Sequence, residues 1–208
     1  LGSQASEVEV LCVDDGSTDG SGAILDEYAA RDPRFRIIHQ QNAGVSEARQ
    51  RGLENVRGKY FGFVDPDDWI EATMYETLVT VAEENGVDYL WENFCQDSAH
   101  GAGAGSQRCD GDNWTQINAL LAGRVLASLC SRLFRTEFVK KNGIRFLRGR
   151  ITACEDLCFH CIIPFFSLVV EVLPEDHLAE HVDAAVVLQR GAHGLVFPCR
   201  QSANFTVA

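Results

Sequence analysis

The chain has 208 residues, of which 46% are hydrophobic and 23% charged, which is ordinary for a globular protein and enough for one α/β domain with a sizeable core. Its formal net charge of −12 argues against nucleic acid as a partner, because phosphate binding requires clustered Lys and Arg. The eight cysteines contain no two matched CxxC pairs, so we expect free thiols in a reducing cytosol.

Compact apolar runs alternate with helical patterns through the first part of the chain. The runs predict strands over residues 8–13, 35–40, 59–65 and 87–94. The patterns between them predict helices over residues 21–32, 45–56 and 71–85. Strands that alternate with helices predict an α/β fold with a parallel sheet and helices on its faces.

The second part of the chain has a weaker pattern. Residues 96–113 are rich in Gly and Ser and predict a flexible loop, which separates residues 1–95 from residues 114–208. We expect a helix at 114–123 and another that begins near Glu155. The apolar stretch 157–173 is short for a membrane span and is interpreted as a helix followed by a strand. Residues 184–208 have no clear assignment.

Acidic side chains follow two of the predicted strands. Asp14 and Asp15 end the first strand, and Asp65 ends the third. Ligands of parallel α/β sheets bind beyond the carboxyl ends of the strands, so these carboxylates are expected at one ligand-binding edge. Helix capping by Ser17 to Asp19 accounts for the following turn but not for the two preceding carboxylates, which are suited to accept hydrogen bonds from a nucleobase or ribose.

The segment FVDPDDW suggests a metal site. Pro66 biases Asp65 toward an extended conformation, in which residues i and i+2 point the same way. Asp65 and Asp67 are therefore predicted to converge on one Mg²⁺ or Mn²⁺ ion, while Asp68 points elsewhere. The alternative is an Asp-rich turn that caps the helix at residue 71.

Two further features have more than one interpretation. In the polar loop HQQNAG, Asn42 and Gly44 turn the chain, and Arg49 beyond it reaches a diphosphate, braces an aspartate or is solvated. Three cysteines at helical spacing either form a metal site or are small residues of a buried helix. They are Cys154, Cys158 and Cys161.

Four sequence pieces in this order and spacing resemble family 2 glycosyltransferases of the GT-A fold, over residues 7–175. They are VDDGSTDGSG, HQQNAGVSEARQRGL, GKYFGFVDPDDWIEATMYETL and CEDLCF. The resemblance implies a GT-A-type, Rossmann-like, mostly parallel sheet flanked by helices. It also implies that residues 1–95 bind a nucleotide sugar and that residues 114–208 form the acceptor side and the C-terminal tail.

The resemblance also implies roles for individual residues. Substrate-binding residues are Asp14 and Asp15 at the nucleobase and ribose, Arg49 near the diphosphate, and Asn42 and Asp65. The DxD-type pair Asp65 and Asp67 holds Mg²⁺ or Mn²⁺ together with the donor. The acidic pair Glu155–Asp156 carries the catalytic base, assigned to Asp156, and His160 either tunes this base or is a core histidine.

The implied activity is inverting transfer of a sugar from a nucleotide-sugar donor, expected to be a UDP-sugar, to a hydroxyl of a glycan or glycolipid acceptor. At family level this belongs to bacterial cell-surface polysaccharide synthesis, with a cytoplasmic location at the inner face of the membrane and peripheral membrane association.

The chain departs from the family pattern at its start and end. The usual first strand, of the type VSVIIPVYN, is missing, so we expect an N-terminally truncated domain whose unpaired sheet edges favour a homo-oligomer. Gln50 stands where the family commonly has Asn, and residues 177–194 replace a Tyr-rich stretch. We do not assign an active-site role to His181, which lies in that stretch.

Three other functions compete with this interpretation. A haloacid-dehalogenase-like phosphatase requires Thr or Val two residues after the second Asp of its motif, where Trp69 stands. A nucleotidyltransferase requires a Gly- and Arg-rich opening that the sequence lacks. An inactive nucleotide-binding or scaffold fragment remains the main alternative, because the loop after the missing strand would contact the nucleotide.

Overall fold

The computed structural model describes residues 8–68, 70, 72–91, 94–98, 101–105, 113–125, 127–130, 132–149, 156–159, 170–172 and 184–190. Nine strands are described: β1 (Glu9–Asp14), β2 (Phe35–His39), β3 (Tyr60–Val64), β4 (Tyr89–Trp91), β5 (Phe94–Ser98), β6 (Gly101–Gly105), β7 (Arg132–Arg135), β8 (Val170–Val172) and β9 (Ala184–Arg190). Its helices are α1 (Ser21–Arg31), α2 (Val45–Asn55), α3 (Met74–Asn85), α4 (Asn113–Leu121) and α5 (Thr136–Lys141), and residues 156–159 are also helical.

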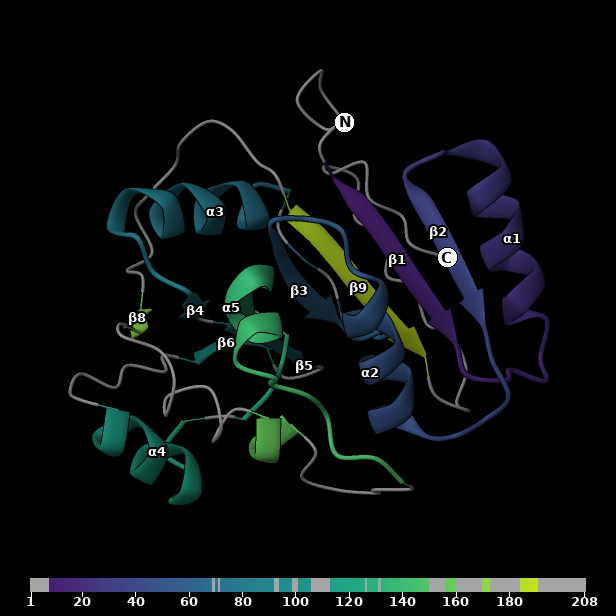
Figure 1. The fold of residues 1–208 in the computed structure, drawn as a ribbon. Coiled ribbons are helices and arrows are strands. Elements are labelled where there is room, and N and C mark those ends of the chain that lie inside the picture. Colours follow the sequence, from purple (N-terminus) through teal and green to yellow (C-terminus); the bar gives the residue numbers. More distant parts are fainter. Residues whose placement is uncertain are drawn as a thin grey trace.

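Seven of the strands form one sheet in the order β2-β1-β9-β3-β7-β4-β8 (Figure 1). Strands β2, β1, β9 and β3 run parallel to one another, whereas β7 is antiparallel to both β3 and β4. The predicted mostly parallel sheet is therefore confirmed. The carboxyl ends of β1 and β3 consequently lie at the same edge, as the argument from the acidic strand ends requires.

The elements predicted in the first part of the chain are all present, within a few residues of the expected boundaries. The second part differs more. Residues 96–113 were predicted to be a flexible loop, but they contain the end of β5 and the whole of β6, which pair as an antiparallel two-stranded sheet. The alternation of Gly and Ala in β6 gave no hydrophobic period from which this strand is predictable.

Strand β9 occupies the centre of the sheet, between β1 and β3. It runs parallel to both, with Leu188 opposite Cys12 on one side and opposite Val64 on the other. The expectation that a missing first strand leaves these two edges unpaired is therefore wrong, and with it the reason for expecting a homo-oligomer. The sequence AAVVLQR has the apolar, β-branched composition of a buried parallel strand, which explains why a tail segment fits there.

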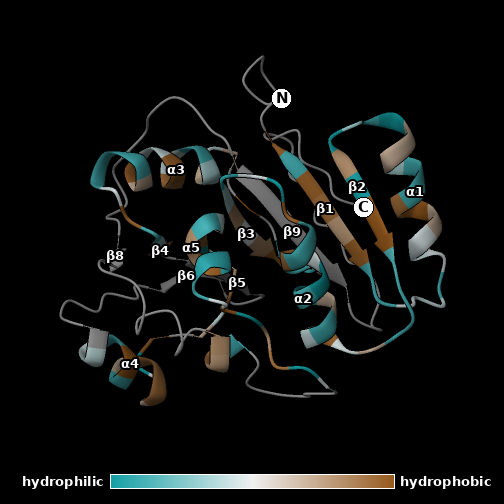
Figure 2. Cartoon of the chain, viewed as in Figure 1, coloured by the Kyte–Doolittle hydropathy of each residue, from teal (hydrophilic) through white to brown (hydrophobic). Residues whose placement is uncertain are grey.

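Helices cover both faces of the sheet, and alternate residues of β3 point to opposite faces. Tyr60 and Val64 belong to a core that contains residues of α1 and α3. Phe61 and Phe63 belong to a second core with residues of α2 and α5. Strand β1 is mostly hydrophobic along its length, whereas the viewed surface of α2 is mostly hydrophilic (Figure 2). This amphipathic division fixes which residues of α2 point at the sheet.

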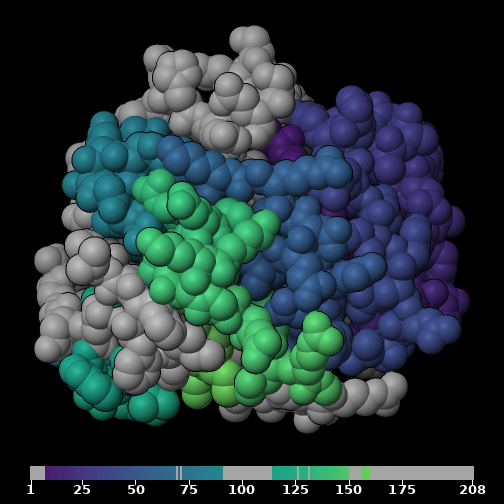
Figure 3. Space-filling model, in the orientation of Figure 1, coloured from purple at the N-terminus to yellow at the C-terminus, as the bar shows by residue number. Residues whose placement is uncertain are grey.

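Helix α2 also holds the segment that follows α5, and residues 132–149 pack beside it on the face seen in Figure 3. The buried Gln50 side chain accepts a hydrogen bond from the backbone N–H of Phe146 at 2.9 Å, and the Ser46 hydroxyl donates to the carbonyl of Leu147 at 2.5 Å. Gln50 thus has a structural role, because its side-chain amide connects α2 to the backbone of the segment that follows α5.

Gly62, in the middle of β3, is expected to tolerate no side chain. A Cβ added there would lie 2.4 Å from the Tyr75 hydroxyl oxygen and 2.7 Å from the backbone carbonyl oxygen of Arg132. Because the second contact is with backbone of the neighbouring strand, we expect Gly62→Ala to lower the free energy of unfolding by about 2–3 kcal/mol. Urea denaturation measures this loss, and a change below about 0.5 kcal/mol would contradict the packing described.

Candidate active site

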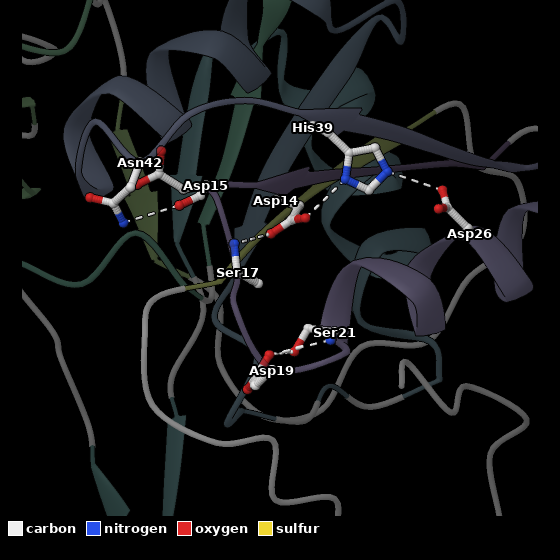
Figure 4. A network of polar contacts seen from close by, with 8 residues as sticks. All are labelled: Asp14, Asp15, Ser17, Asp19, Ser21, Asp26, His39 and Asn42. Atoms are coloured by element: carbon white, nitrogen blue, oxygen red, sulfur yellow. Dashed lines mark hydrogen bonds and ion pairs between the residues drawn. The ribbon is translucent and has the colours of Figure 1, made fainter.

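Asp14 ends β1 at the carboxyl edge and is 5% exposed (Figure 4). Its carboxylate accepts a hydrogen bond from the backbone N–H of Ser17 at 2.9 Å and lies 2.9 Å from Nδ1 of His39. Burial favours the neutral form of Asp14, but the hydrogen bonds from Ser17 and the pairing with His39 outweigh it, so its pKa lies below the ordinary value. The turn beyond it is tied to α1 by Asp19, which accepts a hydrogen bond from the backbone N–H of Ser21.

His39, at the end of β2, bridges two carboxylates. Its Nδ1 faces Asp14 and its Nε2 lies 3.0 Å from a carboxylate oxygen of Asp26 (Figure 4). The hydrogen bonds to Asp26 and Asp14 raise the pKa of His39 above its ordinary value of 6.5. The sequence did not point to His39, because its partners come from β1 and α1. The parallel pairing of β1 with β2 places Asp14 beside His39, and the packing of α1 brings Asp26 there.

This bridge predicts a pH-dependent stability. Because the folded state raises the pKa of His39, the stabilising pairing is fully present below about pH 6.5 and is lost as pH rises through the raised value. Wild type is therefore expected to lose more stability than His39→Gln between about pH 6 and about pH 8.5. Urea denaturation of both proteins at each pH measures this difference. A pH-independent gap between them would contradict the prediction.

Asp15 stabilises the loop that leads into α2 through hydrogen bonds. Its carboxylate accepts hydrogen bonds from the side-chain amide of Gln40 at 2.7 Å and from the backbone N–H groups of Ala43 and Gly44 at 2.9 and 2.8 Å. The Asn42 side-chain amide donates to the backbone carbonyl of Asp15 at 3.0 Å (Figure 4). Both predicted substrate-binding residues, Asp15 and Asn42, thus lie together at the carboxyl edge and shape the loop there. Their contact with a nucleotide stays a prediction.

Arg49 joins three segments of the chain. It projects from α2, is 4% exposed, and its guanidinium lies 3.2 Å from a carboxylate oxygen of Asp65 and is also ion-paired to Asp156. Of the three interpretations of Arg49, the solvated one is therefore excluded and the bracing of aspartates is confirmed. The structure brings the predicted catalytic residue Asp156 beside the predicted metal ligand Asp65, which are remote in sequence.

The turn after β3 differs from the predicted extended segment. The backbone N–H of Asp68 donates to the carbonyl of Asp65 at 3.0 Å, so the chain folds back at Pro66 and Asp67. In such a turn residues i and i+3 come together. A carboxylate oxygen of Asp65, one of Asp68 and the Cys130 sulfur consequently lie within 4.8 Å of one another, so the expectation that Asp68 points elsewhere is wrong.

Asp67 is exposed at the tip of this turn. The group formed by Asp65, Asp68 and Cys130 does not include Asp67, so the role of Asp67 as a metal ligand stays a prediction. The alternative, in which the aspartates cap the next helix, has no support, because α3 begins at Met74 with Thr73 at the capping position and no side-chain capping bond.

Asp68 is exposed, but the surrounding turn partly desolvates its carboxyl, and this desolvation and the charges of Asp65 and Asp67 raise its pKa, against a hydrogen bond with Cys130 that lowers it. Burial and the neighbouring Asp65 and Asp68 likewise raise the pKa of the Cys130 thiol. Without a cation, this cluster therefore resists full ionisation.

Several predicted residues lie outside the described part of the chain. They are Glu155, His160, His181, Cys154 and Cys161. Cys158 is described and is half-buried. Among the described residues, no helix is long and apolar enough to cross a membrane.

Comparison with solved structures defines the class of fold. The S. aureus TarS 1–349 structure in complex with UDP-GlcNAc superposes with a TM-score of 0.67 over 90% of this chain and 51% of that chain, at 22% identity. The complex of the same protein with UDP gives 0.67 over 88% and 52%, also at 22% identity. The predicted GT-A fold is therefore confirmed.

The glycosyl transferase family 2 model matches residues 1–141, and the chain belongs to that family. The putative glycosyltransferase EpsH of Bacillus subtilis (strain 168) is 31% identical over 187 residues, 86% of this chain and 54% of EpsH. The uncharacterized glycosyltransferase YibD of Escherichia coli (strain K12) is 35% identical over 156 residues, 68% of this chain and 44% of YibD. The chain thus spans about half the length of these two relatives.

Proposed function

We propose that this chain carries the donor-binding and catalytic part of an inverting glycosyltransferase, which moves a sugar from a nucleoside diphosphate sugar to an acceptor hydroxyl. The observation that carries the proposal is the contact of Arg49 with both Asp65 and Asp156 at the carboxyl edge of the sheet. Family membership supports the reaction class. The UDP-GlcNAc and UDP bound by TarS support a UDP-sugar as donor.

In this proposal Asp156 is the general base. Inverting transfer needs a carboxylate that removes the proton of the acceptor hydroxyl as its oxygen attacks the sugar C1 from the face opposite the leaving diphosphate. An adjacent guanidinium favours the charged form of a carboxylate, which is the form that accepts a proton. The Asp156 side chain is 24% exposed, so an acceptor can reach it while Arg49 holds it in place.

In this proposal Arg49 also acts on the donor during sugar transfer. Its guanidinium presents several donors in one plane, so it can keep its aspartate contacts and offer an N–H to a diphosphate oxygen. The donor would lie over the ends of β1 and β3, with its nucleobase and ribose toward Asp14 and Asp15. Arg49 thereby links the position of the leaving group to that of the base.

A divalent ion fits beside this arrangement. The Asp65 and Asp68 carboxylates are hard oxygen donors whose oxygens lie within 4.8 Å of each other, close enough for one Mg²⁺ or Mn²⁺ ion. Asp65 and Asp68, together with the predicted ligand Asp67, would hold it. Such an ion offsets the negative charge on the departing diphosphate.

The cellular role that we propose is synthesis of a cell-surface polysaccharide or glycan.

Isothermal titration calorimetry with UDP and Mn²⁺ tests this function. We expect saturable UDP binding that is stronger with Mn²⁺ than without it. Absence of heat from UDP, GDP and TDP, with and without metal, would overturn the proposal and favour the scaffold alternative. Hydrolysis of a generic phosphomonoester would instead favour a phosphatase.

A further inference from the structure

Cys130 lies beside the aspartates of the turn at residues 65–68, here called the β3 turn, because of how β3 and β7 pair. Strands β3 and β7 are antiparallel, with Tyr60 opposite Arg135 and Phe61 opposite Phe134. Continuing this register past the ends of the strands puts Cys130 opposite Asp65. The turn then returns Asp68 to the same place, so one sulfur and two carboxylate oxygens converge within 4.8 Å from two segments of the chain.

The surroundings of Cys130 differ from those of a cysteine that only fills space. Cys12, on β1, is a member of a hydrophobic core cluster and has the ordinary environment of a buried cysteine. Cys130 belongs to none of the hydrophobic clusters formed by the described residues. Its sulfur instead faces two carboxylates, and its backbone N–H is fixed by a 3.2 Å hydrogen bond to the Ser128 hydroxyl.

We propose that Cys130 is a further protein ligand of the divalent ion, in addition to the aspartates, and that its sulfur makes the site select a borderline ion such as Co²⁺ or Zn²⁺ over Mg²⁺. The inference rests on the proposed function, which puts a metal at this turn. Metal–ligand bonds of about 2.0–2.6 Å place the ligands of one ion within about 4–5 Å of one another, as found for the Cys130 sulfur and the carboxylate oxygens of Asp65 and Asp68.

The sulfur ligand determines which metal ion the site prefers. Mg²⁺ takes oxygen ligands almost exclusively, whereas thiolates favour softer ions. On binding, the Cys130 thiol loses its proton to solvent and the sulfur donates its electron pair to the ion. The two carboxylates and the thiolate then face a dication, which removes the repulsion among the three acidic groups.

A Co²⁺ titration tests this inference through the charge-transfer absorption of a cobalt–thiolate bond in the near ultraviolet. In the wild-type chain we expect a band that saturates and survives an excess of Mg²⁺. Cys130→Ser should abolish it, and Asp68→Asn should weaken it. Loss of an outer-shell partner alone costs about 10–100-fold in metal affinity, so loss of this ligand should weaken Co²⁺ binding at least about tenfold by calorimetry.

Cys158→Ser is the matched control, because Cys158 is the half-buried cysteine of the alternative helical cluster. A band lost in Cys158→Ser but kept in Cys130→Ser would overturn the inference. UDP binding with Mn²⁺ but no thiolate band in wild type would also overturn it, while leaving the proposed function standing. A Cys130-dependent band without any nucleotide binding would support the ligand set and overturn the proposed function.

Discussion

Replacing Asp156 by Asn is expected to abolish sugar transfer and to leave donor binding largely intact. An amide of the same shape still occupies the position beside Arg49, but it cannot accept the proton of the acceptor hydroxyl. General base catalysis contributes about 10²–10⁴-fold, so kcat should fall by that factor. The measurement is the initial rate of UDP release from a panel of UDP-sugars with candidate acceptors, alongside calorimetric titration of UDP.

A matched control is Asp88→Asn, which makes the same change in a carboxylate paired with Arg135, away from the carboxyl edge. This variant should transfer sugar at the wild-type rate. If Asp156→Asn transfers sugar normally, the assignment of the base is wrong. If both variants lose UDP binding, the effect is structural and Asp156 has no special place in the reaction.

Replacing Arg49 by Met should impair both stability and transfer. Met keeps much of the buried volume but removes the cation that holds Asp65 and Asp156 together. Loss of one partner of a buried ion pair costs about 3–5 kcal/mol, and the partial exposure of the two carboxylates reduces this to about 1–3 kcal/mol. Transfer should fall by about 10²-fold or more, because a charge that faces the leaving diphosphate is lost.

Two further variants separate these effects. Arg49→Lys keeps the charge but not the planar fork that reaches two carboxylates, so it should recover stability more than activity. Since Arg49 and Asp156 act through one contact, the losses in Arg49→Met and Asp156→Asn should not add in the double variant. Additive losses of transfer would show that Arg49 does not act through Asp156. Urea denaturation and the UDP-release assay provide both readouts.

The positions of site residues that lie at strand ends could be predicted from the sequence, because short segments of local sequence determine where each strand ends. Asp14, Asp15 and Asp65 were expected at one edge, because each follows an apolar run and parallel strands share an edge. One expectation about the aspartates after β3 was wrong: Asp68 lies beside Asp65, because residues 65–68 form a turn and not an extended segment. Pro66 is compatible with both an extended segment and a turn, and only the hydrogen bond from Asp68 to Asp65 selects the turn.

The sequence by itself determined the alternation of strands and helices, the acidic edge and the family, because these depend on local periodicity and on motifs within short segments. Tertiary structure alone decided that β9 lies between β1 and β3, that Arg49 joins Asp65 to Asp156, and that Cys130 faces the β3 turn. Each of these depends on strand order and register between remote segments. No local pattern encodes such contacts, since they follow from how the whole sheet buries its two faces.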